Sequence, residues 1–144
     1  MEIQLAGKYI SILNRLEQRY LMQVMKEYGL GTTDYMFLLY LNVNPGCTQR
    51  QMCSELSLDI ALATRSLGNL EKKGFLVRKN NPKLKRGYEV YLTEQAKVMI
   101  PEILEKSQTW WQGVMQDENM EDVLTVLERM SEHAKINIQN NINN

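Results

Sequence analysis

The chain has 144 residues, of which 44% are hydrophobic and 24% charged, and its formal net charge is zero. This composition is typical of an ordinary globular domain and excludes a disordered chain. The apolar stretch at residues 36–41 is far shorter than the about twenty residues of a transmembrane helix, and no basic region leads into an apolar one at the N-terminus. We therefore expect a cytoplasmic protein with no membrane partner.

The zero net charge hides a segregation of charge along the chain. Residues 1–57 hold five basic and five acidic side chains, residues 58–93 hold eight and three, and residues 94–144 hold four and nine. The middle segment thus carries +5 and the last segment −5. A local excess of Lys and Arg is what binding to a phosphate backbone requires, although such a run is also common on a solvated face.

Apolar residues at helical spacing predict four helices in the first half of the chain. The first spans about residues 5–28, and Thr32 or Thr33 caps a second one that ends before a turn at residues 44–46. Two shorter helices follow. Thr48 caps the third, at residues 49–56, and Asp59 caps the fourth, at about residues 60–73, which Gly74 ends.

After the fourth helix the apolar period changes from helical to alternating. Residues 75–79 and 88–92 are predicted to form two strands rich in aromatic and β-branched side chains, joined by a basic hairpin tip at residues 80–87. Thr93 then caps a long helix to about residue 116, and Asn119 caps the final helix.

Helices followed by a hairpin, in this order, predict a winged helix-turn-helix at residues 47–93 within a mainly α (α+β) fold. A helix that enters the major groove keeps its outer face free of carboxylates, and residues 60–70 contain no acid. On the outer face Arg65 has the donors for guanine, Asn69 has the groups for adenine, and Leu62 fits a thymine methyl.

The basic tip of the hairpin suits the narrow minor groove, where the potential is most negative. The alternative is that its lysines only protect the end of the hairpin from aggregation. The residues expected to contact duplex DNA are Thr48, Gln49, Ala61, Leu62, Thr64, Arg65, Asn69, Arg78, Lys83, Lys85 and Arg86.

The first and last helices carry more apolar side chains than a compact winged domain covers by itself. A second copy of the chain is the natural cover, and a two-fold dimer places two recognition helices about 34–36 Å apart, one turn of the duplex. These side chains are Ile3, Leu5, Tyr9, Ile103, Leu104, Trp110, Trp111, Val114, Val123, Leu127, Ile136 and Ile138.

Residues 64–78, Thr-Arg-Ser-Leu-Gly-Asn-Leu-Glu-Lys-Lys-Gly-Phe-Leu-Val-Arg, followed by Val-Tyr-Leu-Thr at residues 90–93, resemble the recognition helix and wing of the MarR (multiple antibiotic resistance regulator) family. The resemblance covers the whole chain, including its long end helices. It implies an obligate homodimer in which residues 1–30 and 94–144 are dimerisation helices and residues 31–93 form the winged helix-turn-helix DNA-binding domain. Two such domains would read a pseudo-palindromic site.

The sequence departs from the family pattern at a few positions. In the family the wing carries an Asp two residues before its minor-groove Arg. Arg86 matches that Arg, but Leu84 stands where the Asp is expected. Ala61 replaces a common Ser, and Ala96 replaces a common Gly after the wing.

The resemblance also implies a small aromatic or phenolic effector, bound between the dimer helices and the winged domain. The alternative is that these residues are plain core, because aromatic and Met side chains at helical spacing more often pack inside than bind a ligand. The candidates for an effector pocket are Tyr9, Leu16, Tyr20, Tyr35, Met36 and Tyr40.

Other chemistry finds little support in the sequence. Cys47 and Cys53 are expected to be free thiols, with Cys53 buried and Cys47 near a helix N-terminus, where a lowered thiol pKa is an open alternative. His133 is the only histidine, so we expect no metal and no cofactor. No nucleophile–base pair, carboxylate dyad or phosphate-binding loop is present, so we expect no enzyme.

The sequence as a whole predicts a homodimeric, sequence-specific DNA-binding transcriptional regulator. We expect a repressor that recognises a pseudo-palindromic duplex and is released by a small-molecule effector. The alternative is a winged-helix module that binds DNA or protein with low specificity and without a response to ligands.

Overall fold

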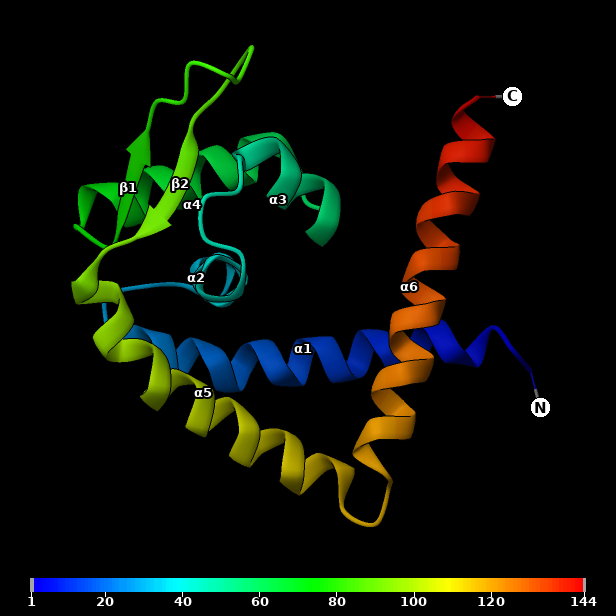
Figure 1. Cartoon of the computed structure of the whole chain (residues 1–144). Coiled ribbons are helices and arrows are strands. Elements are labelled where there is room, and N and C mark those ends of the chain that lie inside the picture. Colours follow the sequence, from blue (N-terminus) through cyan, green and yellow to red (C-terminus); the bar gives the residue numbers. More distant parts are fainter. Residues whose placement is uncertain (1, 144) are drawn as a thin grey trace. The chain divides into compact units, whose positions relative to one another are not determined.

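The computed structural model describes residues 2–143. The chain divides into two compact units, Met1–Trp110 and Trp111–Asn144. Helices and one small antiparallel hairpin make up the fold, which confirms the predicted fold class. In chain order (Figure 1) the elements are α1 (Leu5–Lys26), α2 (Thr32–Val43), α3 (Gln49–Leu56), α4 (Ile60–Lys72), β1 (Leu76–Lys79), β2 (Glu89–Leu92), α5 (Glu94–Met115) and α6 (Met120–Ile142).

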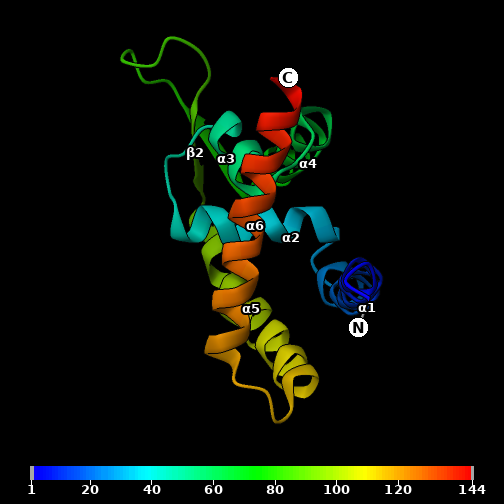
Figure 2. The ribbon, with the colours of Figure 1, turned by 90° about the vertical axis from the view of Figure 1, so that its right-hand side faces the viewer.

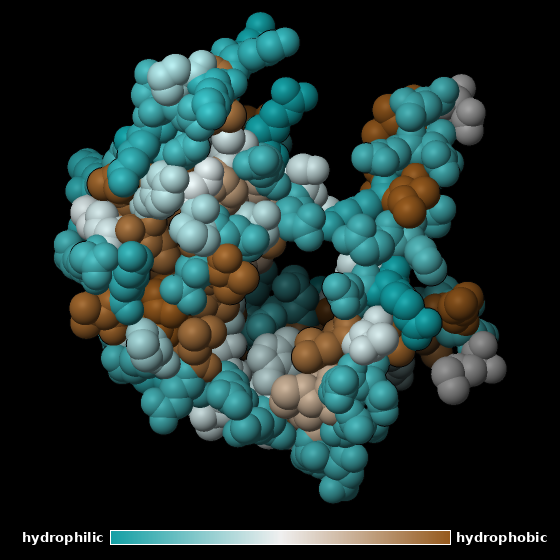
Figure 3. All heavy atoms as spheres, viewed as in Figure 1, coloured by the Kyte–Doolittle hydropathy of each residue, from teal (hydrophilic) through white to brown (hydrophobic). Residues whose placement is uncertain are grey.

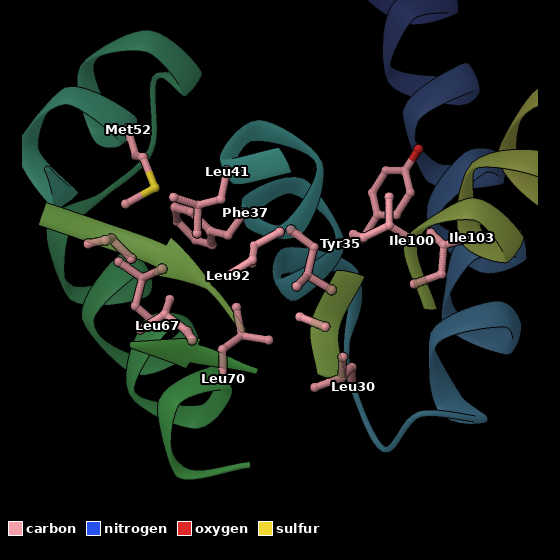
Figure 4. Packing of buried hydrophobic residues seen from close by; sticks show 14 of the residues in the cluster. Leu30, Tyr35, Phe37, Leu41, Met52, Leu67, Leu70, Leu92, Ile100 and Ile103 are labelled. Atoms are coloured by element: carbon pink, nitrogen blue, oxygen red, sulfur yellow. The ribbon is translucent and has the colours of Figure 1, made fainter. Parts of the chain in front are cut away.

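The first unit is built around α2, α4 and the hairpin. Its central side chains converge from several elements, as Figure 4 shows. Full burial of one Leu or Phe side chain contributes about 1.5–3 kcal/mol, so this cluster fixes α4 against α2. At most 1% of each residue's surface is exposed for Phe37, Leu38 and Leu41 of α2, Met52 of α3, Ala63, Leu67 and Leu70 of α4, and Leu76 and Val90 of the strands.

Helices α1 and α5 contribute to the same core. Met25 of α1 and Ile103 of α5 are fully buried in it, so the compact unit extends beyond residues 31–93. Ile103 was predicted among the side chains that a second copy covers, and this is wrong, because it lies on the face of α5 that packs into the core of its own chain. The division into dimerisation helices and a DNA-binding domain stays a prediction.

The hairpin has a short and regular ladder. Leu76 pairs with Leu92, and Lys79 pairs with Glu89 at the far end. The outer edge of β2 is also covered, because Val90 exchanges two backbone hydrogen bonds with the turn before α3, accepting from the Gly46 N–H at 2.9 Å and donating to the Cys47 carbonyl at 3.0 Å. That turn therefore behaves as a third strand, anchoring the hairpin to the helices.

Four helix caps lie where the sequence places them. The Thr48 hydroxyl accepts from the Gln51 N–H at 3.2 Å while the Gln51 side chain accepts from the Thr48 N–H at 2.8 Å, a complete capping box on α3. The side chains of Asp59, Thr93 and Asn119 cap α4, α5 and α6 in the same way. These predicted caps are confirmed, as are the two strands to within one residue at their ends.

The cap of α2 differs from the prediction. Thr32 and Thr33 lie inside the helix, and Gly31 is the N-cap residue. The Asp34 carboxylate accepts from the Gly31 N–H at 2.8 Å, so the first turn is closed by the acid at N3 and not by a Thr hydroxyl. A carboxylate in the first turn also stabilises the helix, because it interacts favourably with the positive end of the helix dipole.

The second unit contains the end of α5 and the whole of α6. None of the described residues of α6 is buried. Hydrophobic side chains stand on its surface, as the brown spheres of Figure 3 show, and they repeat at helical spacing. The large hydrophobic residues that α6 exposes are Met120, Leu124, Val126, Leu127, Met130, Ile136, Ile138 and Ile142.

A polar cluster joins the end of α1 to α5. The Tyr28 hydroxyl donates to Glu102 at 2.6 Å, and the Lys106 ammonium lies 3.1 Å from Glu102 and 3.0 Å from Glu27. Burial and the bond to Glu102 raise the pKa of Tyr28 to about 12. The hydrogen bonds from Tyr28 and Lys106 lower the pKa of Glu102, and the bonds to Glu27 and Glu102 raise the pKa of Lys106.

These shifts predict how stability depends on pH. The lowered pKa of Glu102 stabilises the fold above the ordinary pKa of a Glu side chain, and this stability is lost as the pH falls through the pKa of Glu102 in the folded protein. The raised pKa of Tyr28 has the opposite effect, because its stabilisation is lost as the pH rises from about 10 to about 12. Glu102→Gln should therefore reduce the loss of stability between about pH 5 and pH 3, read as the urea midpoint. Glu105→Gln on the same exposed helix is the control. An equal effect from both variants would contradict the assignment.

Candidate nucleic-acid interface

Helix α4 has one buried face and one solvent face. Ala63, Ser66, Leu67 and Leu70 form the buried face, as the sequence predicts. On the other side Ala61, Thr64 and Arg65 are exposed and Leu62 is half-buried. No acid lies within residues 60–70, and among the described residues the Arg65 side chain has no hydrogen-bond or ion-pair partner. The solvent face of α4 from residue 60 to residue 70 thus offers a cation and no negative charge, and Glu71 follows at its end.

A buried carboxylate holds α4 against α2. Asp34 of α2 is 6% exposed and accepts hydrogen bonds from the Ser66 hydroxyl and from the Asn69 amide, the latter at 3.3 Å. Asn69 is therefore turned toward α2, whereas the sequence places it on the outer face, because Asp34 offers it a partner inside the fold. Asp34 was not among the predicted site residues. Its signal in the sequence is an acid three residues after Gly31.

Three of the predicted contact residues lie together beside α4. The Gln49 amide donates to the Thr64 hydroxyl at 2.9 Å, and the Arg78 guanidinium lies 3.5 Å from the Gln49 oxygen and 3.4 Å from Glu71. The Arg78 side chain is only 24% exposed. Gln49, Thr64 and Arg78 thus tie the start of α3, the middle of α4 and β1 to one another, with Arg78 anchored at Glu71.

The hairpin tip carries the second group of cations. Lys83, Lys85 and Arg86 are exposed, and within residues 2–143 none of their side chains has an ion-pair partner. In both Figure 1 and Figure 2 the loop between β1 and β2 extends away from α3 and α4. The wing therefore presents unpaired positive charge at a distance from the helices, as the sequence predicts.

Asn81 organises the base of this loop. Its amide donates to the Glu89 carboxylate at 2.7 Å, its side-chain oxygen accepts from the Lys83 N–H at 2.9 Å, and its carbonyl accepts from the Leu84 N–H at 2.9 Å. The sequence analysis missed Asn81, although Asn before Pro is a turn signal whose side chain bonds the backbone two residues on. Asn81 thus holds the turn at the base of the wing.

Glu89 extends this wing network into the sheet. It also accepts from the Tyr91 hydroxyl at 2.9 Å, and the hydrogen bonds from Asn81 and Tyr91 lower its pKa. The Lys79 ammonium lies 4.7 Å from the centre of the Tyr91 ring, within the range of a cation–π contact. The Glu89 carboxylate is therefore stabilised in its charged form by hydrogen bonds from Asn81 and Tyr91 and by the nearby Lys79 ammonium.

The six candidate effector residues lie in different surroundings. Tyr35 shares a 2.7 Å hydrogen bond with Ser107, and Tyr20 donates to the Lys106 carbonyl at 2.9 Å and stacks on Trp110. Met36 is half-buried. Tyr9 and Leu16 of α1 are exposed. Tyr40 faces another place, an open groove of about 430 Å³ lined by Tyr40, Asn44, Cys47, Gln51, Ser54 and Glu55.

The cysteines show no sign of an activated thiol. Burial raises the pKa of both Cys47 and Cys53, so the open alternative of a lowered pKa at Cys47 is wrong. Both are free cysteines. Across residues 2–143, no cluster of three His, Cys, Asp or Glu side chains is placed to hold a metal ion, and no helix is long and apolar enough to span a membrane.

Three helices, a hairpin wing and an acid-free exposed helix face define a winged helix-turn-helix protein. The sequence model of the MarR family matches residues 28–87. The chain is 26% identical over 91 residues to the HTH-type transcriptional regulator BilQ of Clostridioides difficile, a match that spans 63% of this chain and 62% of the relative.

Solved structures support the same assignment. A MarR transcriptional regulator from Methanosarcina mazei superposes with a TM-score of 0.84 at 26% identity, covering 93% of this chain and 92% of that one. A MarR-family regulator from Listeria monocytogenes in complex with 26mer DNA has the same fold, with a TM-score of 0.82 at 20% identity, covering 98% and 91%. These matches confirm the resemblance to the MarR family of transcriptional regulators, and the relatives are transcriptional regulators and not enzymes, as the sequence predicts.

The Asn81 network predicts a specific effect on the wing. Asn81→Ala removes the side-chain bonds to Glu89 and Lys83, so the Lys83 amide should exchange with solvent about tenfold faster or more, since local opening sets the rate of exchange. The measurement is hydrogen exchange followed by NMR. Asn80→Ala, which changes a neighbouring exposed Asn, is the control and should leave the rate unchanged. Equal rates in the two variants would show that Asn81 does not order the wing.

Proposed function

We propose that this chain is a homodimeric transcriptional repressor that binds a pseudo-palindromic duplex site through α4 and the wing. The observation that carries the proposal is the pair of unpaired cationic elements on one unit. Arg65 stands on the acid-free face of α4, and Lys83, Lys85 and Arg86 stand on the wing. This arrangement suits binding to duplex DNA, because a recognition helix contacts bases in the major groove while basic side chains beside it neutralise phosphates.

The contacts divide by role. Arg65 is the residue of α4 whose fork of donors fits the O6 and N7 acceptors of guanine, and Leu62 lies one turn earlier, where an apolar side chain meets a thymine methyl. Arg86 on the wing is placed for the minor groove, with Lys83 and Lys85 on the backbone. The relative from Listeria monocytogenes was solved with 26mer DNA, which supports duplex DNA as the partner here.

Dimerisation is supported by the exposed apolar side chains of α6. A helix with no buried residue and with apolar side chains at helical spacing needs a partner surface, and a second copy supplies one. A two-fold dimer also explains a palindromic site. Sedimentation at micromolar concentration should give twice the chain mass of 16.8 kDa, whereas a single 16.8 kDa species would contradict the dimer.

A second candidate is a regulator whose DNA affinity does not respond to a small aromatic ligand. The hydrogen bonds of Tyr20 and Tyr35 inside the chain favour it, because both hydroxyls are already satisfied. Salicylate titrated into the protein–DNA complex separates the two. Release of the DNA supports effector control, and unchanged affinity supports the second candidate.

The central experiment is selection of a binding site from a random duplex pool, followed by affinity measurements at several salt concentrations. A palindromic sequence should be enriched, and the logarithm of affinity should fall linearly with the logarithm of salt concentration, because each phosphate contact releases a counterion. Without an enriched site or a salt dependence, the proposed function is wrong.

Two variants then separate base readout from phosphate binding. Arg65→Ala should weaken the selected site by about 1–3 kcal/mol and relax the preference at one base pair of each half-site. Lys83→Ala should weaken all sequences alike and lower the salt slope by about one. Lys97→Ala, a surface lysine on α5 paired with Glu94, is the control and should change neither quantity. Equal effects of Arg65→Ala on specific and random DNA would contradict its role.

A further inference from the structure

The carboxylate of Asp34 is the one acidic group of the first unit that is buried together with donors from two helices. It is 6% exposed and accepts from Gly31 at the start of its own helix, and from Ser66 and Asn69 of α4. Among the described residues no buried side-chain polar atom lacks a partner, so this cluster is complete. A buried charge that is fully hydrogen-bonded resists any movement that would break a bond, since an unpaired one costs several kcal/mol.

The two bonds to α4 constrain its rotation. Ser66 and Asn69 are three residues apart and lie on the same side of the helix, so Asp34 grips α4 at two points along its axis. Side-chain atoms lie about 6 Å from a helix axis, so a rotation of about 20° displaces them by about 2 Å, which is enough to break a hydrogen bond. The apolar contacts of α4 are non-directional, so the two hydrogen bonds add a directional constraint to its packing.

Arg65, the residue proposed to contact a DNA base, lies next to the residues of α4 that Asp34 holds. Arg65 directly precedes Ser66, lies one turn before Asn69 and is exposed to solvent, so the rotation of α4 that Asp34 fixes also sets the direction of the guanidinium. The same bonds keep Asn69 turned toward α2, away from a groove in which its amide would pair with adenine. The hydrogen bonds of Asp34 therefore both orient Arg65 and keep Asn69 away from the DNA.

We propose that Asp34, which lies outside the recognition helix, is a positioning residue for sequence readout. Through Ser66 and Asn69 it fixes the angle at which α4 presents Arg65 and holds Asn69 out of the groove. This inference rests on the proposed function. It adds that specificity depends on a buried residue of α2 that never touches DNA.

The structure offers a matched pair of variants for the test. Ser66 and Ser107 are 7% and 8% exposed, and each hydroxyl bonds a residue of α2, Asp34 in one case and the adjacent Tyr35 in the other. Ser66→Ala and Ser107→Ala therefore delete the same group at the same depth. Only Ser66→Ala loosens the grip on α4.

The readout is the ratio of affinities for the selected site and for a random duplex of equal length. Ser66→Ala should lower this ratio about tenfold, the loss expected for one misplaced bidentate contact, with random-duplex affinity and salt slope unchanged. Ser107→Ala should keep the wild-type ratio. Urea unfolding of both variants checks that their stabilities are similar. A merely structural role would lower the ratio in both variants or in neither.

Asp34→Asn is the second variant, and it preserves the shape of the side chain while removing the charge. It should lower the ratio in the same direction, and a repeat of the site selection should give an altered preference, because Asn69 is less firmly held. An unchanged ratio and an unchanged selected site in Ser66→Ala and Asp34→Asn would overturn the inference while leaving the proposed function intact. If the wild-type protein selects no site, the proposed function fails first.

Discussion

The hydrogen-bonded carboxylate between α2 and α4 is the constraint on which the winged unit depends. The apolar core brings the two helices together, but it does so through contacts that many orientations satisfy nearly as well. The Asp34 carboxylate removes that freedom, because only one rotation of α4 supplies donors from both Ser66 and Asn69. The core thus brings the two helices into contact, and the Asp34 carboxylate fixes the rotation of α4 about its axis. The direction in which α4 presents its exposed side chains therefore depends on a buried group of α2.

The wing is held by a separate set of polar contacts. Asn81 closes the turn onto the backbone of Lys83, and Glu89 links that turn to Tyr91 in the sheet. These bonds are local in sequence, and they leave the three cations of the tip unpaired. The tip of the wing and the buried face of α4 are therefore held by different polar side chains, while Arg78 links β1 to α4 through Glu71.

Much of the fold follows from local chemistry that a single sequence displays. Thr48, Asp59, Thr93 and Asn119 are found as caps because a capping side chain bonds an N–H only two or three residues away. The errors concern partners that are distant in sequence. Nothing near Asn69 indicates that Asp34, 35 residues earlier, accepts its hydrogen bond. Likewise, helical spacing marks Ile103 as apolar, but only the packed structure shows which surface covers it. Arg65, Lys83, Lys85 and Arg86 are exposed as predicted, because a charged side chain on the surface does not depend on a partner elsewhere in the chain.

The turn before α3 has one more consequence, for engineering of the chain. Exposed turns are usually the places where inserted residues or tags are tolerated. Here Gly46 adopts a positive φ of 85°, and a Cβ at this position would lie 2.7 Å from the Tyr91 hydroxyl. The Gly46 N–H and the Cys47 carbonyl both form hydrogen bonds with Val90, so lengthening this turn would break the backbone hydrogen bonds at the outer edge of β2. Since an isolated two-stranded hairpin is only marginally stable, a label placed there would unfold the wing from a distance. This surface turn thus supports the sheet through its two backbone hydrogen bonds to β2.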